Sequence, residues 1–131
     1  MNTQIPTPDG MLTLILLHSP TVCVCMGFLK HGQPPEQETY GGCDQPGITE
    51  LRAALVAGRS VIVHDHHSGE MHARALWDEH AQCLTLRAAA ESADVILDEA
   101  ARTALLGFLT DVLDAFPARP SASTPLASSA P

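Results

Sequence analysis

The sequence predicts a single α+β domain in which an antiparallel sheet of about five strands carries one or two helices on one face. Short apolar runs separated by glycine, proline and serine are typical of strands, and one strongly periodic segment near the C-terminus is typical of a helix. The length of 131 residues, 45% of them hydrophobic, is enough for one buried core without disulfides or a metal. We expect this domain to span residues 1–116, and residues 117–131, rich in proline, serine and alanine, to form a flexible tail.

The first two strands are predicted at residues 11–18 and 21–29. Residues 1–10 hold two prolines and no hydrophobic period, which predicts an irregular lead-in. The two apolar runs meet at a Ser-Pro turn, as neighbouring strands do. In the second run apolar residues and thiols alternate between two faces: Val22, Val24, Met26 and Phe28 against Cys23 and Cys25.

A long loop is predicted at residues 31–47, because its glycines and prolines disfavour regular structure. Loops of this length in a small domain often carry function, which makes its aromatic residue, Tyr40, a candidate contact for a partner. Residues 48–57 then predict a short helix, and Gly58 supplies the left-handed residue that ends it.

A hairpin is predicted next, with strands at residues 59–67 and 70–80 joined by a two-residue Ser68-Gly69 turn. This turn would place His64 opposite Ala73, and it would point Ile62, His64, His66 and Trp77 inward. Residues 82–87 predict a third strand. The segment 78–92 also has helical propensity, and only the alternation of leucine with polar residues favours the strand.

The last helix is predicted from Asp98, its N-cap, to Phe116, before Pro117. Its outer face carries small and polar residues in a narrow stripe: Thr103, Gly107, Thr110 and Asp114, with Asp111 beside them. Gly107 weakens a helix interior and often marks the close approach of another backbone, and carboxylates at a helix C-terminus oppose its dipole. The stripe is therefore a predicted partner-binding surface, and a merely solvated face is the alternative.

Composition limits the class of protein. Fifteen acidic residues against seven lysines and arginines give a net charge of −8, which argues against direct nucleic-acid binding. Only 17% of residues are charged, which indicates a surface covered by a protein partner or by a second copy. The apolar stretch at 11–28 is interrupted and lacks a basic start, and the four cysteines form no two-residue-gap pair. We expect a cytoplasmic protein, free of the membrane, with reduced thiols that pack as small hydrophobic side chains.

The histidines form the only dense cluster of potential metal ligands, with four of them between His64 and His72. Imidazole is a ligand for zinc and other divalent transition metals, so a candidate ligand set is His64, His66, Glu70 and His72. A solvated hairpin whose histidines shield a sheet edge is the alternative.

The spacing of Gly58, His64, His66 and Glu70 resembles the first signature of the cupin metal-binding barrels. The resemblance covers 13 residues and implies that the two histidines and the glutamate bind a divalent metal together with a later histidine. Trp77 stands where that signature ends in glycine, and no histidine follows His80.

Two functional classes follow from these features. The first is a non-enzymatic interaction module without a cofactor, an inhibitor or antagonist of a protein partner, similar in type to the small acidic anti-CRISPR proteins of phages. The second is a divalent-metal-binding protein that uses the hairpin at residues 64–72. For nucleophilic catalysis only Cys43 and Cys83 are candidates, and neither lies in a recognisable motif.

Overall fold

The structure is a computed structural model that describes residues 1–18, 21–64, 74–88 and 91–117. It confirms the α+β class, with the strands divided between two antiparallel sheets of four strands instead of one sheet of about five. The N-terminal sheet consists of β1 (Asn2–Pro6), β2 (Gly10–Leu17), β3 (Cys23–Lys30) and β4 (Thr39–Asp44). The C-terminal sheet consists of β5 (Val61–His64), β6 (Arg74–Asp78), β7 (Cys83–Arg87) and β8 (Ser92–Ile96). The helices are η1 (Pro35–Gln37), a 3₁₀ turn, α1 (Gln45–Ala57) and α2 (Glu99–Ala115).

Apart from the 3₁₀ turn η1 between β3 and β4, the order of elements repeats: four strands in sequence order followed by one α-helix, twice. Both α-helices begin in the same way. The Asp44 carboxylate accepts a hydrogen bond from the Gly47 N–H at 3.1 Å, and the Asp98 carboxylate accepts one from the Ala101 N–H at 2.8 Å. Each aspartate satisfies a backbone donor that the first helical turn leaves unpaired.

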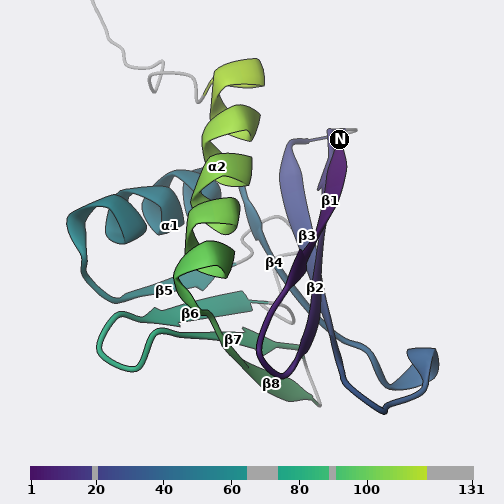
Figure 1. Ribbon diagram of the computed structural model, residues 1–131. Helices are drawn as coiled ribbons and strands as arrows, with labels where there is room; N and C mark the ends of the chain where they lie inside the picture. The colour runs from purple at the N-terminus through teal and green to yellow at the C-terminus, as the bar shows by residue number, and fades with distance from the viewer. Residues whose placement is uncertain (19–20, 65–73, 89–90, 118–131) are drawn as a thin grey trace, which may run out of the picture.

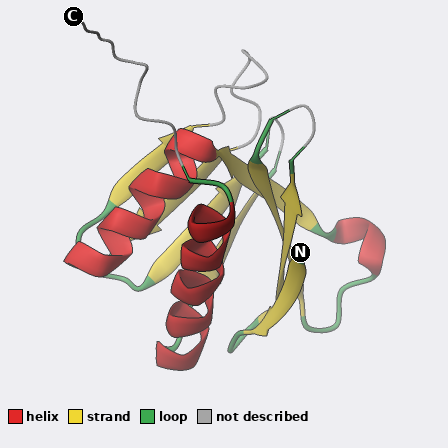
Figure 2. Cartoon of the chain, turned by 90° about the horizontal axis from the view of Figure 1, so that it is seen from above, coloured by secondary structure: helices red, strands yellow, loops and turns green. Residues whose placement is uncertain are grey.

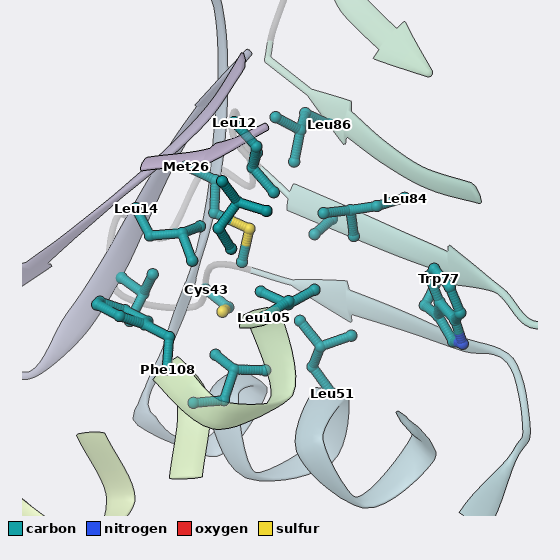
Figure 3. Packing of buried hydrophobic residues seen from close by; sticks show 14 of the residues in the cluster. Leu12, Leu14, Met26, Cys43, Leu51, Trp77, Leu84, Leu86, Leu105 and Phe108 are labelled. Carbon is teal, nitrogen blue, oxygen red and sulfur yellow. The ribbon is translucent and has the colours of Figure 1, made fainter. Parts of the chain in front are cut away.

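The two halves share one core. Figure 1 shows α1 and α2 in the angle between the two sheets, and Figure 2 shows the same arrangement from above. Side chains from all four parts converge there, as Figure 3 shows for Leu14, Leu84, Leu51 and Leu105. Each sheet therefore has an inner face that packs on the helices and an outer face that neither α1 nor α2 covers.

The predicted irregular lead-in at residues 1–10 is wrong, because most of it forms β1, an edge strand paired with β2. Only Ile5 brings a large apolar side chain from β1 into the core, so the segment has no visible hydrophobic period. Thr7 holds the turn, since its hydroxyl accepts from the Gly10 N–H at 3.1 Å and donates to the Gly10 carbonyl at 2.9 Å. An edge strand tolerates Pro6, whose missing N–H a central strand would need.

The predicted loop at residues 31–47 is too long. Its second half forms β4 and the first turn of α1. Glycine was the misleading signal: a Cβ on Gly42 would lie 2.8 Å from the Val24 carbonyl oxygen, so the close pairing of β4 with β3 needs a residue without a side chain. Pro46 lies in the first turn of α1, where its missing N–H costs nothing. The helix end at Gly58 is confirmed, with a φ of 70°.

The predicted hairpin exists, but its register is displaced by one residue. His64 pairs with Arg74 instead of Ala73, and Val63 pairs with the buried Ala75. One residue of displacement exchanges the two faces of a strand. Ile62 is consequently 54% exposed and not inward, whereas Trp77 is buried as predicted. The predicted pairs between residues 65 and 73 lie outside the described residues.

The elements after the hairpin agree more closely with the predictions from the sequence. The third strand at 82–87 is confirmed as β7, so the helical alternative for 78–92 is wrong there. The last helix and its Asp98 N-cap are confirmed. The strand β8 was not predicted, because Val95 is its only fully buried residue and Asp94 lies beside it. The predicted tail lies outside the described residues except for Pro117.

The short cupin-like motif is not accompanied by a cupin fold. Cupins are jelly rolls built from Greek keys, whereas each sheet here is a simple meander in sequence order. Among the described residues, no helix combines the length and the hydropathy needed to cross a membrane.

Candidate binding surface

The outer face of the N-terminal sheet carries apolar side chains that neither α1 nor α2 covers. Ile15 and Leu17 of β2 and Tyr40 of β4 are 37%, 48% and 49% exposed. Half-buried residues of β2 and β3 continue the same face, among them Met11, Cys25 and Leu29. Large apolar groups left together on one sheet face are typical of a surface that another molecule covers.

A hollow of about 310 Å³ lies in this face. Its apolar walls come from Met11, Ile15 and Leu29, and Gln4 and Thr13 add neutral polar groups. Its floor is Gly27 in the middle of β3, which pairs with Tyr40. We call this feature the Gly27 hollow.

Glycine at the floor lets two neighbouring side chains lie across the strand. A Cβ on Gly27 would be 2.5 Å from Glu38 Oε2 and 3.1 Å from Tyr40 Cε1. Both distances are shorter than ordinary van der Waals contact. Because residue 27 has no side chain, Glu38 and Tyr40 have room to lie over the sheet at this position.

Glu38 and Tyr40 are joined by a hydrogen bond in which the phenol O–H donates to Oε1 at 2.8 Å. This bond, followed by the negative charge of Glu38, raises the pKa of Tyr40 above its ordinary value. The phenol therefore keeps its proton, and its hydrogen bond to Glu38, to a higher pH than an ordinary tyrosine would.

Cys25, at the edge of the same hollow, is not activated as a nucleophile. Burial, followed by the charge of Glu38, raises the pKa of its thiol. Burial also raises the pKa of Cys83, and Cys43 is buried in the core at 1% exposure. All four cysteines are described and none forms a disulfide, and the raised pKa values of Cys25 and Cys83 make these two thiols poor nucleophiles at neutral pH.

The predicted partner-binding stripe on α2 is only partly available to a partner. Thr103, Gly107, Asp111 and Asp114 are exposed, whereas the hydroxyl of Thr110 accepts a hydrogen bond from Arg52 Nε of α1 at 2.8 Å. A Cβ on Gly107 would have no neighbour within 4 Å among the described residues outside its own stretch of helix, so no other described backbone approaches it. The helix α2 packs on the inner face of the N-terminal sheet, where Figure 3 shows Leu105 and Phe108 near Leu14. Tyr40 belongs to the outer face, so the stripe and Tyr40 lie on opposite sides of that sheet. The structure does not bring these predicted residues into one site.

The predicted metal ligands lie almost entirely outside what the structure describes. His66, Glu70 and His72 belong to the segment 65–73, and of His64 only the backbone in β5 is described. Within the described residues, no three histidine, cysteine, aspartate or glutamate side chains lie close enough together to hold a metal.

Of the residues at this candidate surface, the sequence predicts Tyr40 as a contact and gives no prediction for Glu38 or Gly27. The alternation of Glu38 and Tyr40 at the start of a strand was the available signal, and it was hidden because residues 31–47 were interpreted as one loop. The facing position of Gly27 follows only from the register between β3 and β4.

Comparison with known proteins gives no family for this chain. No protein-family model matches it, and neither a curated protein nor a solved structure shows significant similarity to it.

Proposed function

We propose that the chain is a non-enzymatic protein-binding module that acts as an inhibitor or antagonist by holding a protein partner on the outer face of the N-terminal sheet. The observation that carries this proposal is the uncovered apolar face around the Gly27 hollow, with Tyr40 at 49% exposure beside it. Aromatic anchors next to a recess are the usual centre of a protein interface.

Two further observations support a binding role over a catalytic one. The thiol nearest the hollow, Cys25, has a raised pKa, so it is a poor nucleophile at neutral pH. The low charged fraction of 17% is typical of a surface that is covered in use.

The test compares substitutions on three surfaces. The immobilised protein is used to isolate a partner from cells that contain it, and the partner is then purified and its affinity measured by calorimetry. Ile15→Asp places a charge in the centre of the proposed surface, and we expect it to weaken binding by about a hundredfold or more. Ile62→Asp is the matched control, because Ile62 is an exposed isoleucine on the outer face of the other sheet.

The α2 stripe is tested in the same experiment with Gly107→Leu and Asp114→Arg. Both positions are exposed, so neither substitution disturbs the core. Loss of affinity in these variants, with unchanged affinity in Ile15→Asp, would place the interface on α2 and reject the sheet surface.

A further inference from the structure

The described residues that line the Gly27 hollow include a carboxylate and no cation. Of the residues that line it, only Glu38 carries a formal charge at neutral pH. One oxygen of this carboxylate accepts the hydrogen bond from Tyr40, and nothing in the described part of the chain donates to the other oxygen, Oε2. A charge at the edge of an apolar recess interacts more strongly with a counter-charge than one in open water does.

The surroundings of Glu38 favour one kind of cation. The ring of Tyr40 lies over Gly27 beside the carboxylate, so it offers an aromatic surface next to a hydrogen-bond acceptor. A guanidinium group is planar, weakly hydrated and able to stack on a ring while donating to a carboxylate, whereas a lysine ammonium is a compact and strongly hydrated charge.

The rest of the hollow suits the aliphatic part of the same side chain. Met11, Ile15 and Leu29 form its apolar walls, and long basic side chains commonly bury their methylene stems on such surfaces. The volume of about 310 Å³ is at the lower limit of small-molecule sites, which fits one or two protein side chains. The net charge of −8 also favours a basic partner surface.

We infer that the Gly27 hollow receives an arginine side chain of the protein partner, with the guanidinium bound to Glu38 against the Tyr40 ring and an adjacent apolar residue on Met11, Ile15 and Leu29. This inference rests on the proposed function and adds the chemistry of the partner segment: an arginine next to an aliphatic residue.

The test uses a defined probe and its neutral isostere. The ¹⁵N-labelled protein is titrated with the capped dipeptide acetyl-Leu-Arg-N-methylamide, and in parallel with the same peptide carrying citrulline in place of arginine. We expect the arginine peptide to shift the backbone amides of Cys25, Gly27 and Tyr40, with a dissociation constant on the order of millimolar. The citrulline peptide keeps the shape but not the charge, so its binding should be about tenfold weaker.

Two variants assign the effect to one carboxylate. Glu38→Gln keeps a hydrogen-bond acceptor for Tyr40 and removes the charge, so it should reduce arginine-peptide binding to the citrulline level. Glu36→Gln is the matched control, because Glu36 is an exposed glutamate of η1 that does not line the hollow. Equal binding of the two peptides, equal loss in both variants, or shifts confined to other parts of the protein would overturn the inference.

The experiment separates failure of this inference from failure of the proposed function. If the partner loses affinity for Ile15→Asp but binds Glu38→Gln as it binds the parent protein, the sheet face is the interface and arginine is not its anchor. If neither substitution changes the affinity, the proposed surface itself is wrong. If Cys25, Gly27 and Tyr40 shift with protein concentration alone, the occupant is a second copy of this chain and the arginine inference fails.

Discussion

Gly107 and Gly27 both lie inside regular elements, but the space beside them differs: it is open at Gly107 and occupied at Gly27. Gly107 lies in the middle of α2 with open space where a Cβ would be, whereas Gly27 lies in β3 beneath Glu38 and Tyr40. The first glycine only weakens its helix. The second leaves room for Glu38 and Tyr40, so the same residue type weakens its element in one place and allows a close side-chain arrangement in the other.

Gly107→Ala should stabilise the protein. Alanine restricts the unfolded chain and meets no neighbour in the folded one, so we expect the free energy of unfolding to rise by about 1 kcal/mol. Urea denaturation measures this change. Gly58→Ala is the contrasting variant and should lower the free energy by about 1 kcal/mol, because φ at residue 58 is 70°. A lower stability of Gly107→Ala would contradict the open surroundings of that residue.

The pKa of Tyr40 reports directly on Glu38. Removing the negative charge in Glu38→Gln should lower the Tyr40 pKa towards the ordinary value of about 10. Gly27→Ala should act in the same direction, because its methyl group displaces the Glu38 carboxylate. Tyr40 is the single tyrosine of the chain, so an absorbance titration resolves it without a mutant background. Glu36→Gln should leave the titration unchanged, and an equal shift in that variant would show that the hydrogen bond is not the cause.

At the scale of elements, Arg102 connects α2 to both α1 and the C-terminal sheet. Its guanidinium donates to the Leu55 carbonyl at the end of α1 at 2.7 Å and to Glu79 Oε1 at 3.0 Å. It also lies over the Trp77 ring, 5.7 Å from the ring centroid. The indole N–H of Trp77 donates to the same carboxylate oxygen at 2.9 Å, so Glu79 is the centre of this junction.

Glu79 should make stability depend on pH in the acid range. The Trp77 hydrogen bond, followed by those from Arg102 and Gln82, lowers the Glu79 pKa below its ordinary value. A lowered pKa in the folded state means that the stabilisation is complete above the unfolded value of about 4.3 and is lost as the pH falls through the folded value.

Glu79→Gln should therefore lower the Tm at pH 7 and reduce the further loss of stability between about pH 5 and about pH 3. Thermal unfolding across this range measures both effects. Glu91→Gln, at an exposed position, is the control that should keep the parental profile. An unchanged slope in Glu79→Gln would mean that the carboxylate does not titrate as this junction requires.

Length and periodicity decide which elements the sequence could predict. The strand β2 and the helix α2 were recognisable because each places several buried residues at regular spacing. The strands β1 and β8 each have one fully buried apolar residue, and β4 contains Gly41 and Gly42, so local sequence could not separate them from loops. The candidate site depends on β4 and its register with β3, which explains why the sequence pointed to Tyr40 but not to Glu38 or Gly27.

At the scale of the whole molecule, the sequence shows no internal repeat, yet the elements repeat as four strands and a helix. The shared features are a capping aspartate and buried residues at equal spacing after it. Gly47, Leu51 and Leu55 follow Asp44 at the intervals at which Ala101, Leu105 and Leu109 follow Asp98. Packing requires this pattern of burial, and the residue types at other positions are free to differ.

The histidine cluster bears on the class to which the whole molecule belongs. If the chain is a non-enzymatic binding module, simultaneous replacement of His64, His66 and His72 by alanine should leave the Tm and partner affinity nearly unchanged. Native mass spectrometry of protein purified without added metal or chelator is the accompanying measurement. A stoichiometric zinc adduct that disappears on acidification and in the triple variant would support the metal-binding class instead.

The contact between the first strand and the last helix has a consequence for biosynthesis. β1 packs against α2, and Ile5 belongs to the same buried cluster as Leu105 and Phe108. A ribosome makes β1 before α2, and α2 follows every other described element, so the part of the N-terminal sheet that α2 covers stays open until α2 has been made. Ribosome-bound chains that stop before residue 99 should therefore expose this apolar surface to chaperones and proteases. Folding is completed only when α2 packs on the sheet.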